Sequence, residues 1–133
     1  MSAAISEPLR NAGLSVLLFG TYLIALGAIL LLLPNLLLGV FGIPDTHEVW
    51  VRILGGVLMA LGYLYVEGGR AVAEWFIRAS VLSRAGVAAV LFGLVVLGEA
   101  PRVIALFAFV DLAAAMWTAY ALGWPWMRRG GAT

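Results

Sequence analysis

The chain has 133 residues, of which 64% are hydrophobic and only 11% are charged, and its formal net charge is +1. A soluble domain contains about 25% charged residues, so this composition indicates a membrane protein. The small net charge argues against a nucleic-acid partner, which would need a basic patch. The absence of cysteine excludes disulfides, thiolate metal sites and cysteine nucleophiles.

The first apolar segment, residues 13–33, contains no charged residue. About twenty apolar residues cross the ~30 Å hydrocarbon core of a bilayer, so a membrane-spanning helix is predicted here. A signal peptide is the alternative, but its apolar part is usually about 7–15 residues long and no A-x-A-like cleavage site follows. Pro34 and Asn35 close the helix. Residues 36–44 are too short to span and are expected to lie at the membrane interface.

The second span is predicted at residues 49–66. Asp45 and Glu48 before it have the spacing of a capping box, with Asp45 as the N-cap. Residues 67–70 are expected to form a polar turn, and the chain then re-enters the membrane as an amphipathic turn around Trp75.

The third and fourth spans, residues 79–98 and 103–122, are joined by a tight turn at residues 99–102. The tail places two tryptophans beside two arginines, the order expected where aromatic rings sit at headgroup depth and arginines face the cytoplasm. These tail residues are Trp124, Trp126, Arg128 and Arg129.

Four spans place both termini on one side of the membrane, and that side carries most of the arginines. The positive-inside rule therefore predicts cytoplasmic termini, in a multi-pass protein of a bacterial inner membrane. The arginines on the side of the termini are Arg10, Arg70, Arg78, Arg128 and Arg129.

Small residues recur seven positions apart in every span, which keeps them on one helix face and lets membrane helices approach closely. The pairs are Gly20 and Gly27, Gly55 and Gly62, Gly86 and Gly93, and Ala108 and Ala115. The predicted fold class is an all-α membrane protein, a four-transmembrane-helix bundle that forms a single domain over residues 1–133.

Asp111 is the one carboxylate inside the last span. An ionisable side chain at that depth costs roughly 3 kcal/mol on insertion scales, so a partner or a function is expected for it. Ile104, Ala108, Ala115 and Thr118 share its helix face, which suggests a face turned inward.

Two arginines are eligible partners of Asp111. Arg52 lies ~5 Å and Arg84 ~8 Å inside the membrane, from opposite sides, at ~1.5 Å of rise per residue. Tyr63 shares a face of the second span with Arg52, and Tyr22 adds a hydroxyl on the first span. These residues predict a column of polar groups through the bundle.

Three interpretations of this column stay open. A buried ion pair that fixes helix rotation is the preferred explanation of Asp111. The sharper alternative is a ligand-binding pocket lined by Asp111, Arg52, Arg84, Tyr63 and Tyr22. A proton or ion pathway has least support, because the spans contain one carboxylate and neither His nor Lys.

No metal site and no cofactor are expected. His47 is the only histidine, and the two acids near it are already explained by helix capping. Neither a phosphate-binding glycine loop nor a nucleophile or metalloprotease motif occurs.

Several short motifs resemble those of the DoxX-like group of small bacterial four-helix integral membrane proteins. They are Trp50-x-Arg52-x-x-Gly55, Gly62-Tyr63-x-Tyr65, Arg84, Asp111-Leu112 and Trp117-Thr118. The resemblance covers roughly residues 13–122 and implies the four-helix architecture and, by analogy with some members, a redox or respiratory accessory role. Thiol redox chemistry does not carry over, because cysteine is absent.

The expected function is that of a non-enzymatic accessory protein that binds a membrane lipid or a hydrophobic small molecule around Asp111. One alternative is an intramembrane isomerase that uses Asp111 as acid and base, with Tyr63 and Arg84 orienting a carbonyl or hydroxyl. The other is a subunit of a larger membrane complex or of a homo-oligomer.

Overall fold

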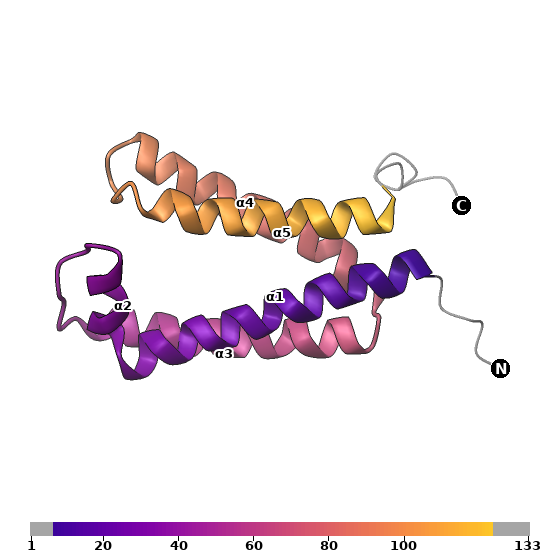
Figure 1. Ribbon diagram of the computed structural model, residues 1–133, viewed down its shortest axis with the longest axis horizontal. Helices are drawn as coiled ribbons and strands as arrows, with labels where there is room; N and C mark the ends of the chain where they lie inside the picture. The colour runs from indigo at the N-terminus through magenta and orange to yellow at the C-terminus, as the bar shows by residue number, and fades with distance from the viewer. Residues whose placement is uncertain (1–6, 124–133) are drawn as a thin grey trace. The chain divides into compact units, whose positions relative to one another are not determined.

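The computed structural model describes residues 7–123, which form five α-helices and no strand (Figure 1). The helices are α1 (Glu7–Leu32), α2 (Pro34–Val40), α3 (Val49–Arg70), α4 (Glu74–Val96) and α5 (Ile104–Leu122). All except α2 are long and apolar enough to cross a membrane. The predicted all-α class with four membrane-spanning helices is therefore confirmed. The predicted interfacial tail, from Trp124 onward, lies outside the described residues.

Proline and glycine mark the ends of these helices. Proline lacks the backbone N–H that a helix interior needs, and Pro34 accordingly separates α1 from α2, where it is the first residue of the new helix. Gly98 and Gly123 follow α4 and α5 with φ values of 79° and 84°, which end a helix without steric cost.

The connection between α3 and α4 differs from the prediction. Residues 67–70 form the last turn of α3, and Trp75 lies in the first turn of α4, so neither segment is a separate turn. The N-terminal part of α1 packs closely against this last turn of α3, since a Cβ atom on Gly13 would lie 2.9 Å from the Gly69 carbonyl oxygen.

The predicted capping box before α3 is also wrong. The helix begins at Val49, four residues after Asp45, so Asp45 is too far from the first turn to cap it. The Thr46 hydroxyl instead accepts a hydrogen bond of 3.1 Å from the Glu48 N–H, and the Thr46 N–H donates to the Asn35 side-chain oxygen at 2.9 Å.

The chain forms two compact units: unit 1 comprises Met1–Val16 and Gly68–Thr133, and unit 2 comprises Leu17–Glu67. Helix α1 belongs to both units, because it begins in unit 1 and ends in unit 2. Each unit is described separately below.

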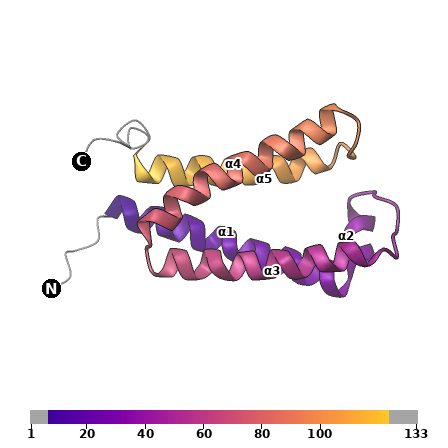
Figure 2. The ribbon, with the colours of Figure 1, turned by 180° about the vertical axis from the view of Figure 1, so that it is seen from behind.

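In unit 2, α3 runs beside the second part of α1 (Figures 1 and 2). A Cβ atom on Gly20 would lie 2.7 Å from the Gly62 carbonyl oxygen, and one on Gly27 would collide with the Gly55 carbonyl oxygen. The predicted close approach of glycine faces is confirmed for these two helices. The rings of Phe19 and Tyr65, 5.5 Å apart, fill the space beside the glycine contact.

In unit 1, α4 and α5 pack side by side (Figures 1 and 2). Ala108 and Ala115 are 0% and 2% exposed, so the predicted alanine face of α5 is buried. The glycine pair of α4 does not behave in the same way. A Cβ atom on Gly86 or Gly93 would meet no described atom within 4 Å.

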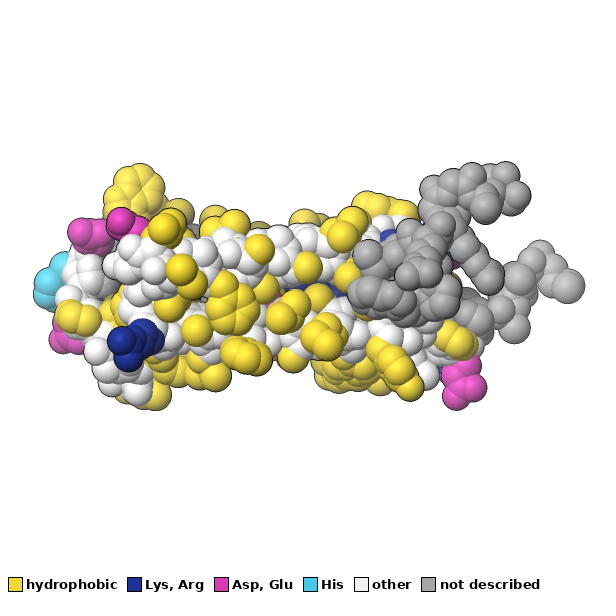
Figure 3. Space-filling model, turned by 90° about the horizontal axis from the view of Figure 1, so that it is seen from above, with side chains coloured by type: hydrophobic (Ala, Val, Ile, Leu, Met, Phe, Trp, Pro, Cys, Tyr) yellow, Lys and Arg dark blue, Asp and Glu magenta, His cyan; other side chains and the backbone are white. Residues whose placement is uncertain are grey.

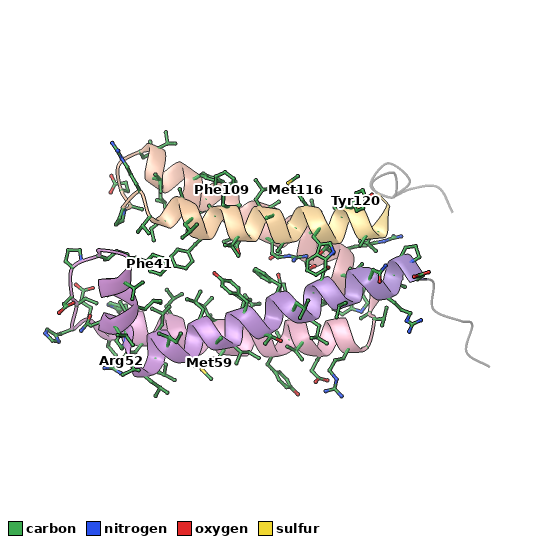
Figure 4. All side chains as sticks on the ribbon, in the orientation of Figure 1. Phe41, Arg52, Met59, Phe109, Met116 and Tyr120 are labelled. Atoms are coloured by element: carbon green, nitrogen blue, oxygen red, sulfur yellow. The ribbon has the colours of Figure 1, made fainter. Side chains whose placement is uncertain are left out.

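Large apolar side chains cover the outer surfaces of the long helices, as the space-filling view shows for one face (Figure 3). On α5, the labelled Phe109, Met116 and Tyr120 lie along one edge of the helix (Figure 4), and their exposed fractions are 62%, 61% and 84%. Soluble monomers rarely expose apolar surface on this scale, whereas hydrocarbon solvates it well.

Candidate functional site

Among the described residues of unit 1, Arg84 on α4 is the charged side chain that is buried, with 2% of its surface exposed. Its Nε donates to the Ser80 carbonyl oxygen at 3.1 Å, and its Nη2 donates to the Ser80 hydroxyl at 3.0 Å and to the Thr118 hydroxyl at 2.8 Å. Ser80 and Arg84 are four residues apart and share one face of α4. The guanidinium therefore links α4 to α5.

A chain of buried hydroxyls continues from Arg84 to α1. The Thr118 and Ser15 hydroxyl oxygens lie 2.6 Å apart, and the exposed fractions of Ser15, Ser80 and Thr118 are 1%, 3% and 0%. Ser15, Ser80, Arg84 and Thr118 are called the hydroxyl network below. Because every member is buried and hydrogen-bonded, the network holds the positive charge of Arg84 in a fixed place.

Asp111 lies on the same face of α5 as Thr118, seven residues away, and is half-buried. Two helical turns separate these residues by about 10 Å along the helix axis. Among the residues that the structure describes, none forms a hydrogen bond or an ion pair with the Asp111 carboxylate.

The preferred expectation, a buried ion pair of Asp111 with an arginine, is therefore wrong for the described residues. Arg84 donates its hydrogen bonds at the level of Thr118, two turns from the carboxylate, because Ser80 holds its side chain there. Arg84 and Asp111 therefore lie on two helices of unit 1 that pack together, but no hydrogen bond or ion pair joins the two side chains.

Arg52 has a different role from the predicted one. It lies near the start of α3, on the exposed surface (Figure 4), and its Nη1 donates to the Leu31 carbonyl oxygen at 2.6 Å. The last carbonyls of a helix have no partner within the helix, and a cation near them is favourable. Arg52 therefore caps the end of α1.

The two predicted tyrosines also lie in unit 2 and do not form a polar column there. Tyr63 is 60% exposed, whereas Tyr65, two residues later, is 4% exposed. The Tyr22 ring packs against Phe19 with 5.6 Å between ring centres. Of the predicted site residues, Arg84 and Asp111 belong to unit 1, whereas Tyr22, Arg52 and Tyr63 belong to unit 2.

Sequence reasoning placed Thr118 on the face of Asp111 but missed that it binds Arg84. It also missed Ser15 and Ser80 entirely. The four-residue spacing of Ser80 and Arg84 was an available signal, because a hydroxyl one turn before an arginine is within its reach on a helix. The position of Ser15 on α1 has no comparable signal.

The acidic connection before α3 does not assemble a metal site with other elements. Asp45, His47 and Glu48 are exposed, and within residues 7–123 no three His, Cys, Asp or Glu side chains are grouped so as to hold a metal ion.

Searches of protein-family models, of characterised proteins and of solved structures give no match to this chain. The resemblance to DoxX-like proteins therefore stays a prediction, and the function has to be argued from the site itself. The site combines an acceptor carboxylate near the middle of a membrane-spanning helix with a fixed positive charge nearby.

Proposed function

We propose that this protein is a non-enzymatic, multi-pass membrane protein that binds the polar group of a lipid or of another hydrophobic small molecule at Asp111. The observation that carries the proposal is the Asp111 carboxylate itself, half-buried in a membrane-spanning helix and not hydrogen-bonded to any described residue.

The energetic argument starts from the cost of that carboxylate. A charged side chain near the centre of a bilayer costs roughly 3 kcal/mol on insertion scales, and a buried polar group is tolerated when it is hydrogen-bonded. The described part of the protein supplies no hydrogen bond to Asp111, so a bound molecule is the natural source of one.

The enzymatic alternative has less support than binding. An isomerase would need a second polar group to orient the substrate beside Asp111, and the predicted one, Tyr63, is 60% exposed on α3. Arg84, the other candidate, already donates hydrogen bonds to Ser80 and Thr118.

The proposed location is a bacterial inner membrane with cytoplasmic termini. The distribution of arginine supports this orientation, because Arg10 in α1, Arg70 at the end of α3 and Arg78 in α4 lie on the side of the termini if each long helix crosses once. A C-terminal reporter that works only in the cytoplasm should be active, and one that works only outside the cytoplasm should be inactive. The opposite result would reverse the orientation.

The binding proposal is tested by native mass spectrometry of the purified full chain. Wild-type protein should carry a bound lipophilic molecule, and Asp111→Leu, which removes the carboxylate and keeps the branched shape of the side chain, should lose it. Asp45→Leu makes the same chemical change in the exposed connection before α3 and should retain it.

Three results would contradict the proposal or revise it. Equal ligand content in wild type and Asp111→Leu would remove Asp111 from binding. Loss of the ligand in both variants would point to a general effect on the fold. A spectrum of ligand-free dimers or larger assemblies would favour the alternative of a subunit that packs against copies of itself.

A further inference from the structure

Residues 79–98 and 103–122 of unit 1 together contain one positive and one negative charge. Arg84 is the only charged residue between positions 79 and 98, and Asp111 is the only one between positions 103 and 122. Their charges sum to zero. A cationic ligand at Asp111 would be repelled by Arg84 and would leave a net charge in an apolar environment, which is costly.

An anionic ligand is disfavoured by Asp111 itself. The ionised carboxylate would repel an anion at close range, and an anion would leave a net negative charge in an apolar environment, which is costly.

The depth of Asp111 also favours a neutral ligand. The carboxylate is seven residues from the start of α5, or about 10 Å into the span. On any one transfer scale, a neutral hydroxyl group costs less to carry to that depth than a charged group.

We infer that the ligand held at Asp111 is an uncharged lipid with a hydroxyl group, such as a long-chain alcohol or a diacylglycerol. The inference rests on the proposed function and names its ligand class. A hydroxyl suits Asp111 in both of its protonation states, since it donates to an ionised carboxylate and both donates to and accepts from a protonated one. Ester and ketone oxygens only accept, so they cannot bind the ionised form.

The test uses three probes that share one hydrocarbon chain and differ in the polar group: oleyl alcohol, oleylamine and oleic acid. Each is titrated into full-length protein in nanodiscs, and the bound fraction is measured by native mass spectrometry. Oleyl alcohol should bind saturably to the wild type, and oleylamine and oleic acid should bind about tenfold more weakly, which corresponds to about 1.4 kcal/mol.

The outcomes separate the ligand class from the binding site. If oleylamine or oleic acid binds as tightly as oleyl alcohol, and Asp111→Leu abolishes that binding, the inferred class is wrong and the binding site stands. If no probe binds saturably, or all bind Asp111→Leu as well as wild type, the proposed function fails and the inference fails with it. The comparison of probes uses wild-type protein, so it does not depend on how a variant folds.

Discussion

Thr118 is the residue on which the buried polar interior of unit 1 depends. Its hydroxyl accepts a hydrogen bond from Arg84 and lies 2.6 Å from the Ser15 hydroxyl, so it touches groups on two other helices. Removing the Thr118 hydroxyl would take a hydrogen-bond partner from Arg84 and a polar neighbour from Ser15, and both of these side chains are buried away from water.

Thr118→Val should therefore destabilise the protein by about 1–2 kcal/mol, near the upper end of the values found for hydrogen bonds between membrane helices. Unfolding by a denaturing detergent, followed by circular dichroism, measures this change. Thr21→Val is the matched control, because the exposed Thr21 hydroxyl donates only to the Leu17 carbonyl of its own helix turn, at 3.0 Å. Equal stabilities of the two variants would show that the hydroxyl network contributes nothing.

The site could be predicted in part from the spacing of residues on single helices. Helical periodicity placed Asp111, Ala115 and Thr118 on one face, and that face is at least half-buried throughout. Periodicity could not show which arginine nitrogen meets which hydroxyl, because this depends on the vertical offset between α4 and α5. The sequence does not give this offset, and for that reason the predicted ion pair between Asp111 and an arginine was wrong.

The glycine pairs illustrate the same limit for whole helices. All three pairs have the same seven-residue spacing, yet only those of α1 and α3 face an opposing backbone at close range. A single helix sequence shows that a close approach is possible, while the neighbour decides whether it occurs. Turn residues were similarly misleading at residues 67–70, where two glycines and two charged residues continue α3.

Gly20→Ala and Gly86→Ala should consequently have opposite effects. The added methyl on Gly20 would lie 2.7 Å from the Gly62 carbonyl, so α1 and α3 must separate, at about 1–3 kcal/mol. The methyl on Gly86 meets no described atom within 4 Å, so this variant should be neutral or more stable by up to about 1 kcal/mol through helix propensity. A destabilised Gly86→Ala in detergent unfolding would indicate that this face of α4 is packed after all.

At the scale of the whole molecule, the chain uses four apolar helices to carry very few charges into the membrane. The hydrocarbon core of a bilayer sets how long and how apolar a spanning segment must be. Composition and segment length were therefore sufficient to predict the number of long helices. Composition did not distinguish a charge that holds the fold together from one that serves a ligand. Arg52 and Arg84 prove to stabilise helix contacts, whereas Asp111 makes no hydrogen bond within the described residues.

The central claim is that Asp111 serves a ligand and not the fold, and the stability of Asp111→Leu stripped of lipid tests it most directly. A carboxylate that stabilises no contact can be replaced by an apolar side chain without loss. The free energy of unfolding should stay equal to that of ligand-free wild type or rise by up to about 3 kcal/mol. A fall of more than about 1 kcal/mol would show that Asp111 holds the helices together, and would contradict the claim.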